Sequence, residues 1–159
     1  MSVLVALLCA PCIEACGSRS NREAKVARAP SSDLERFSKV VNLVERPIEV
    51  TYQIMPVGTP GGFGPTDYRL IAAVKYDSAS LGRLKERARR LSPEVRSCAL
   101  SERPDWFPAP LQAAMKRCSL DWCIDGERYS GDDFRKAGYV SGSFIVPEGQ
   151  EFIILQLGT

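Results

Sequence analysis

The chain has 159 residues, of which 45% are hydrophobic and 25% charged, and its formal net charge is +2. This is the composition of an ordinary globular protein of one domain, and the small net charge predicts no general attraction to nucleic acid. The sequence contains no histidine, which excludes Ser-His-Asp triads, Cys-His dyads and histidine metal ligands.

The first segment is a short apolar run, SVLVALLCAPCI, that leads into a cysteine-rich stretch. A run of about 12 residues has the length of a signal-peptide core and is too short to span a bilayer. The stretch Ile13-Glu14-Ala15-Cys16 resembles the lipobox of bacterial lipoproteins, although Glu14 stands where lipoboxes place a small or apolar residue. The resemblance implies a signal peptide over 1–15 and a lipid such as palmitate on Cys16. It also implies a location on the periplasmic side of a bacterial cell-envelope membrane.

The same cysteines allow other interpretations. Cys9, Cys12 and Cys16 form part of a ligand set for zinc or an iron–sulfur cluster if a later cysteine supplies the fourth thiolate. The segment is otherwise a cleaved signal peptide without a lipid, or a buried helix.

Residues 16–32 are polar and rich in Ser, Ala and Arg, which is typical of a flexible linker. In the lipoprotein interpretation, this linker ties the lipid to a folded domain over 33–159. Its four basic residues either contact anionic lipid headgroups or are simply solvated.

The folded part starts with a helix over 33–45, for which Ser32 and Asp33 are good caps. The alternating segments 48–57 and 68–77 predict two strands of a hairpin. The Gly- and Pro-rich loop between them lacks the lysine of a phosphate-binding loop. It is a hairpin tip, whose exposed Phe63 is a candidate contact with a partner.

A basic helix follows, with Ser78 or Ser80 as its cap and Pro93 beyond its end. Its apolar residues recur at helical spacing, and its opposite side is strongly basic. This basic side is either a solvated surface or a binding site for an acidic partner. The candidate partner-binding residues are Arg83, Lys85, Arg87, Arg89 and Arg90.

Residues 94–123 are rich in proline and contain a short helical stretch over 111–118 together with Cys98, Cys118 and Cys123. In an oxidising compartment, three cysteines predict one disulfide and one free thiol, with Cys98 bonded to Cys118 or to Cys123. In a reducing compartment, all three are small buried hydrophobic residues.

Two further hairpins are expected near the end of the chain. Asp125-Gly126 is a turn signal within WCIDGERY. Residues 147–150 form the turn of a second hairpin, whose last strand is apolar enough to lie inside a sheet. We therefore predict an α+β fold of a single small domain, with a mainly antiparallel sheet and two or three helices packed on one face.

No catalytic motif occurs, so the expected function is protein binding in the cell envelope, as an accessory subunit or an inhibitor or immunity-type partner. We expect no catalytic residues, no metal, no cofactor and no nucleic acid partner. One alternative is a small-ligand or lipid-binding module with its pocket between helix 33–45 and the sheet. A histidine-free hydrolase with two carboxylates is a further alternative.

Overall fold

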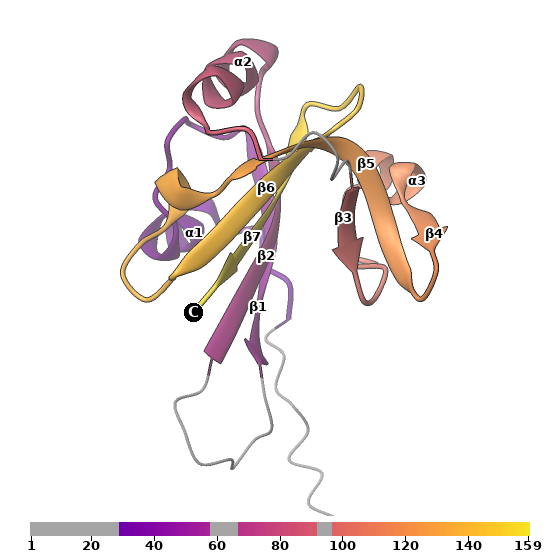
Figure 1. Ribbon diagram of the computed structural model, residues 1–159. Coiled ribbons are helices and arrows are strands. Elements are labelled where there is room, and N and C mark those ends of the chain that lie inside the picture. Colours follow the sequence, from indigo (N-terminus) through magenta and orange to yellow (C-terminus); the bar gives the residue numbers. More distant parts are fainter. Residues whose placement is uncertain (1–28, 58–66, 92–96) are drawn as a thin grey trace, which may run out of the picture.

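The computed structural model describes residues 29–57, 67–91 and 97–159, and of residues 97–99 the backbone alone. A seven-stranded antiparallel sheet forms the centre of the described part, and helices lie around it (Figure 1). In chain order, the elements are α1 (Leu34–Val40), β1 (Glu49–Val57), β2 (Asp67–Lys75), α2 (Ser78–Arg87), β3 (Ser97–Leu100), α3 (Ala109–Ala114), β4 (Lys116–Cys118), β5 (Asp121–Ser130), the 3₁₀ helix η1 (Asp132–Phe134), β6 (Ser141–Pro147) and β7 (Phe152–Gly158).

The strands follow the order β1-β2-β7-β6-β5-β3, and β4 pairs with β5 beside this path. The predicted hairpin of 48–57 and 68–77 is confirmed by the pairing of β1 with β2, and the predicted last hairpin by the pairing of β6 with β7. The final strand β7 lies between β2 and β6, as its apolar sequence predicted. The α+β fold with an antiparallel sheet is therefore confirmed.

Both faces of the sheet are covered, which explains why its central strands are almost continuously apolar. The core consists of two hydrophobic clusters, one on each face of the sheet. Successive residues of β7 belong to different clusters, because side chains alternate between the faces of a strand. Ile153 packs with residues of α1 and α2, whereas Ile154 packs with Leu111 of α3.

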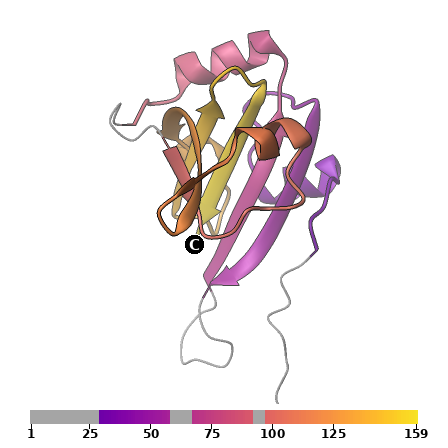
Figure 2. The ribbon, with the colours of Figure 1, turned by 90° about the vertical axis from the view of Figure 1, so that its right-hand side faces the viewer.

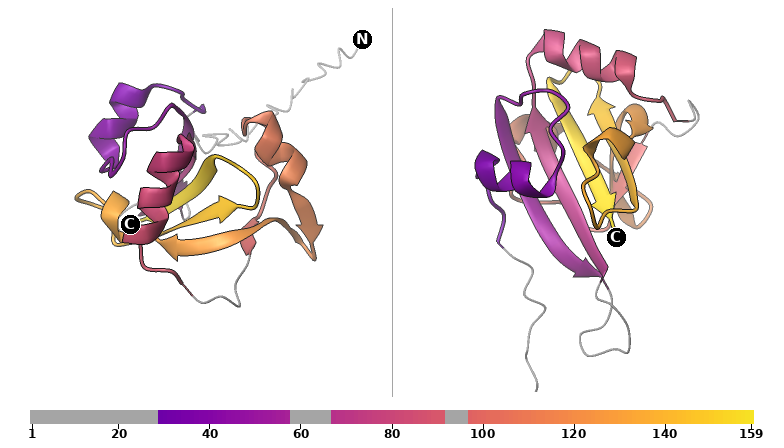
Figure 3. Two further views of the ribbon diagram at one scale, coloured as in Figure 1. Left: turned by 90° about the horizontal axis from the view of Figure 1, so that it is seen from above. Right: turned by 90° about the vertical axis from the view of Figure 1, so that its left-hand side faces the viewer.

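The helices are thus divided between the two faces of the sheet, and the expected packing of all helices on one face is not shown. Figure 2 views α3 and the β4–β5 hairpin in front of the central strands, and Figure 3 places α1 and α2 elsewhere around the sheet. The reason lies in β5, which pairs with β6 at one end and carries β3 and β4 at the other. Because β5 curves, it takes these short strands and α3 around to the second face (Figure 1).

The prediction of a turn at Asp125-Gly126 is wrong, since both residues lie inside the continuous strand β5. Gly126 is needed for another reason: a Cβ built there would overlap the carbonyl of Val146 and approach Pro147. The glycine allows β5 and β6 to lie close together where β5 leaves the main sheet.

Helix boundaries also differ from the predictions. Asp33 does cap α1 by accepting a hydrogen bond from the Arg36 amide, but the helix ends at Val40 because the Asn42 amide bonds instead to the Phe134 carbonyl. The cap of α2 is Asp77, and the helical stretch expected over 111–118 is α3 followed by β4.

The last residues of the predicted linker already belong to the sheet. Ser31 exchanges two backbone hydrogen bonds with Tyr52 of the edge strand β1. Residues 1–28, including Cys16, lie outside the described residues, as does Phe63 in the loop 58–66.

Candidate functional site: a cleft beside the basic helix

The candidate site is built around α2, whose buried and exposed sides are fixed by its sequence. The Asp77 carboxylate accepts hydrogen bonds from both the amide and the hydroxyl of Ser80. These bonds, the one from the amide first, hold the pKa of Asp77 below its usual value. Leu81 and Leu84 are buried against the sheet, so the basic residues of the helix lie toward its outer side.

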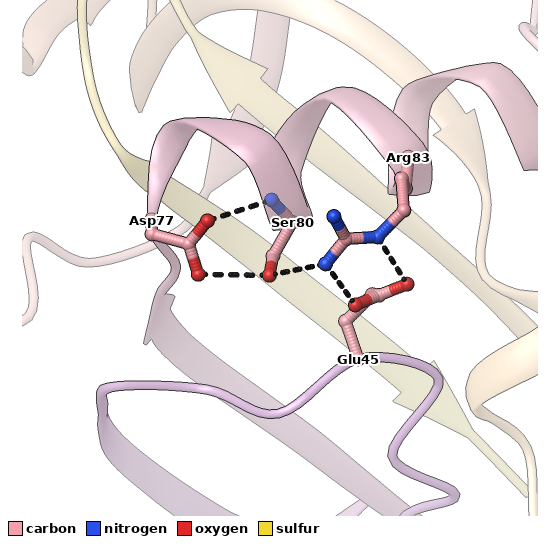
Figure 4. A network of polar contacts seen from close by, with 4 residues as sticks. All are labelled: Glu45, Asp77, Ser80 and Arg83. Carbon is pink, nitrogen blue, oxygen red and sulfur yellow. Dashed lines mark hydrogen bonds and ion pairs between the residues drawn. The ribbon is translucent and has the colours of Figure 1, made fainter.

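The predicted binding residue Arg83 is engaged within the protein. Its guanidinium forms a two-pronged ion pair with Glu45, with N···O distances of 3.0 and 2.8 Å, and also donates to the Ser80 hydroxyl (Figure 4). The hydrogen bond from Arg83 lowers the pKa of Glu45 and in turn raises the pKa of Arg83.

Lys85 and Arg90 share one carboxylate, that of Glu127 on β5. The Tyr129 hydroxyl donates a third contact to the same carboxylate, at 3.0 Å. These contacts, with the Lys85 hydrogen bond first, lower the pKa of Glu127, whereas burial and the bond to Glu127 raise the pKa of Tyr129 to about 12. The two cations are therefore held at the surface between α2 and β5.

Of the other two predicted residues, Arg87 pairs with Asp133 of η1 at 3.1 Å. Arg89 is exposed and forms no ion pair with any described residue. The pKa of Asp132 is lowered first by the hydrogen bond from the Ser130 hydroxyl and, to a smaller extent, by the charges of Arg135 and Arg89. The structure brings the five predicted cations together on α2 and the three residues that follow it, since Arg89 and Arg90 lie beyond the end of the helix at Arg87. Four of the five already have carboxylate partners. The basic side of α2 is largely an intramolecular ion-pair surface.

A cleft of about 870 Å³ opens beside this surface, between α2, β5 and the β6–β7 turn. Of the predicted residues, Lys85 and Arg90 line it, whereas Arg83, Arg87 and Arg89 do not. Apolar lining comes from Leu81, Leu91 and Val146, and carboxylates come from Glu127, Glu148 and Glu151.

Sequence reasoning missed the part of the cleft that comes from β5 and the β6–β7 turn, because these segments carry no motif. One signal was present in Gly82, which lies inside a helix where glycine is unfavourable by about 1 kcal/mol relative to alanine. A Cβ built at Gly82 meets nothing within 4 Å, so packing does not require a glycine there. The residue lines the cleft and leaves it open.

A second, smaller hollow of about 270 Å³ lies between α1 and the sheet. Val40, Ile54, Tyr68 and Tyr139 give it an apolar character. Its position is the one expected for the pocket of a small-ligand or lipid-binding module.

A second group of cations lies on the far side of the molecule, around Trp122 of β5. The guanidinium carbons of Arg103 and Arg117 lie 5.2 and 5.3 Å from the centre of the Trp122 ring, within the range of cation–π attraction. Within the described part of the chain, neither arginine forms an ion pair with a carboxylate.

The predicted disulfide residues lie in the same region. Cys118 is half-buried on β4, Cys123 is buried on β5, and both are free thiols. Cys98 belongs to β3, where its backbone lies opposite Ile124.

Neither a metal centre nor a membrane span is found among the residues that the structure describes. Their His, Cys, Asp and Glu side chains form no group of three able to hold a metal ion. None of the described helices is both long enough and apolar enough to cross a bilayer. In comparisons with known proteins, no family model, no curated protein and no solved structure matches this chain.

Proposed function

We propose that the protein is a lipid-anchored, non-catalytic binding protein of the bacterial cell envelope, which seats a segment of another envelope protein in the cleft beside α2. The observation that carries the proposal is the cleft itself. It is large, and it brings apolar residues together with charged groups of both signs. Such a mixed lining suits a protein segment, which presents polar backbone groups as well as side chains.

The internal ion pairs refine which of the predicted basic residues bind the partner. Arg83 and Arg87 are occupied by Glu45 and Asp133 outside the cleft, so they act in folding. Lys85 and Arg90 share a single carboxylate and line the cleft, so each keeps N–H groups for the partner. Phe63 remains a candidate contact of the loop 58–66.

Gly82 offers a direct test of the cleft. Gly82→Tyr places a large side chain in the cleft and removes an unfavourable helical glycine, so the fold is expected to be retained. Glu86→Tyr is the matched control, since Glu86 is exposed on the same helix and does not line the cleft. In pull-downs from envelope extracts, we expect Gly82→Tyr to reduce partner capture at least about tenfold, equivalent to about 1.4 kcal/mol. Equal capture by both variants would contradict the proposal.

The anchor is tested separately by labelling cells with a palmitate analogue. We expect labelling of the wild type and none of Cys16→Ala. Label on both proteins, or on neither, would remove the lipid anchor from the proposal.

The small hollow between α1 and the sheet supports a second candidate function, the binding of a small apolar ligand or lipid. Its apolar residues are the favourable observation. If this is the function, a lipid co-purifies with the wild type and is lost from Ile54→Trp, which fills the hollow, whereas Gly82→Tyr retains it.

A further inference from the structure

The β4–β5 hairpin places two cysteines on one face of a short two-stranded ribbon. Cys118 lies opposite Asp121, and Cys123 lies opposite Lys116. Residues directly opposite each other share a face, and so do alternate residues of one strand. Cys118 and Cys123 are therefore diagonal neighbours on the same face, joined through the two-residue turn Ser119-Leu120.

The two thiols influence each other. A hydrogen bond between them, together with the burial of Cys123, raises the pKa of Cys123 to about 11. Cys118 is the more exposed of the two sulfurs. The pair thus consists of an accessible thiol and a buried thiol beside it, an arrangement in which one sulfur reacts first and the other completes the bond.

We propose that Cys118 and Cys123 form a disulfide across the β4–β5 hairpin. The oxidant is an organic disulfide, which accepts two electrons and two protons and becomes two thiols. The Cys118 thiolate attacks this disulfide, releases the first thiol and becomes a mixed disulfide. The Cys123 sulfur then attacks the Cys118 sulfur, loses its proton and displaces the second thiol.

The backbone favours this pairing over both pairings with Cys98. β3 and β4 both pair with Trp122 and Cys123 of β5, so β5 lies between them. Cys98 and Cys118 are two strand spacings apart, roughly 9.5 Å, which exceeds the reach of a disulfide. In β3, the residue opposite Cys123 is Ala99, so the Cys98 backbone is displaced by one residue from that position.

The disulfide would secure the weakest strand of the described sheet. β4 has three residues, two of them exposed, and it pairs only with β5. Its formation in the cell depends on the envelope location proposed above, because the cytosol keeps thiols reduced. The ability to form the bond in vitro does not depend on that location, so the two proposals can fail separately.

Tryptic digestion separates the three pairings. Lys116, Arg117 and Arg128 bound a peptide of residues 118–128, which contains Cys118 and Cys123, whereas Cys98 lies in a different peptide. The full-length protein is equilibrated with oxidised and reduced glutathione, alkylated with iodoacetamide, digested and analysed by mass spectrometry. We expect peptide 118–128 without alkyl groups and lighter than the reduced peptide by two hydrogen atoms. A doubly alkylated peptide at every glutathione ratio, or one cross-linked to any other cysteine, would overturn the proposal.

Three variants complete the test. Cys98→Ser is expected to leave the internal disulfide unchanged, and loss of the bond in this variant would contradict the pairing. For the order of attack, Cys123→Ser keeps the accessible thiol and Cys118→Ser keeps the buried one. Cys118→Ser is expected to react with an aromatic disulfide reagent at least about tenfold more slowly than Cys123→Ser. Equal rates would overturn Cys118 as the attacking sulfur.

Discussion

The two ends of this molecule hold their exposed cations in different ways. Around α2, carboxylates from distant parts of the chain pair with the basic residues, as Glu45 does with Arg83. Around the β4–β5 hairpin, Lys116 also pairs with a carboxylate, that of Asp125, but Arg103 and Arg117 lie against the Trp122 ring. A dense run of arginine and lysine in a sequence therefore does not by itself define a free basic surface. Whether such residues are free depends on the carboxylates that the fold places beside them. Here these carboxylates, Glu45 and Asp133, lie 38 and 46 residues away in the sequence from Arg83 and Arg87.

The largest effect is expected from a substitution in β5, the strand that joins the two regions. Gly126→Ala puts a Cβ against the Val146 carbonyl, so we expect a loss of about 2 kcal/mol of unfolding free energy in urea denaturation. Gly82→Ala is the matched control, because its added Cβ meets no atom within 4 Å and alanine is more favourable than glycine inside a helix. It is expected to stabilise the protein by about 0.5–1 kcal/mol. Similar effects of the two substitutions would mean that β5 and β6 are not held close together at Gly126.

High salt is expected to distinguish the arginines that pair with carboxylates from those that lie on the Trp122 ring. Arg87→Gln removes an exposed ion pair, and Arg117→Gln removes a cation–π contact, each contributing about 0.5 kcal/mol. In about 1 M NaCl, the Debye length is about 3 Å, so the effect of Arg87→Gln is expected to vanish. The effect of Arg117→Gln is expected to remain, since its side chain also packs on the ring. Urea unfolding at low and high salt measures the effect of each substitution on stability. If salt reduced both effects equally, the two contacts would not differ in the way proposed.

Lowering the pH tests the ion pair of Glu127, with an effect as small as those of the salt experiment. Since Lys85 and Tyr129 lower the pKa of Glu127, ionised Glu127 contributes stability above the ordinary glutamate pKa of about 4.3, and this is lost as the pH falls through the folded value. Glu127→Gln is expected to reduce stability by about 0.5 kcal/mol at neutral pH and to make no difference near pH 2. Glu148→Gln is the control, because Glu148 forms no ion pair with any described residue. A constant difference at every pH would contradict the role of the charge.

The sequence predicted β1, β2, β6 and β7 well, because their patterns are local, whereas the longest strand, β5, was divided into a hairpin. Alternation identified the β1–β2 hairpin, the turn at 147–150 identified the β6–β7 hairpin, and the apolar run 152–157 predicted an inner strand. The short strands β3 and β4 were missed, since three or four residues are too few for a period to show. Gly126 was misread as part of a turn because a close approach of two strands requires the same residue type as a tight turn.

The candidate site was predicted in part. The five cations on and just after α2 were found because they are close together in the sequence, and two of them line the cleft. Their carboxylate partners could not be found, because only the fold brings Glu45, Glu127 and Asp133 to the helix.

The claim that the cations of α2 serve the fold is tested most directly by reversing the Arg83–Glu45 pair. Arg83→Glu and Glu45→Arg each place two like charges together, and each is expected to lower the urea concentration at the midpoint of unfolding. The double variant restores opposite charges at the same positions. Its urea midpoint is predicted to return to that of the wild type. A double variant as unstable as the sum of the two single variants would contradict the account.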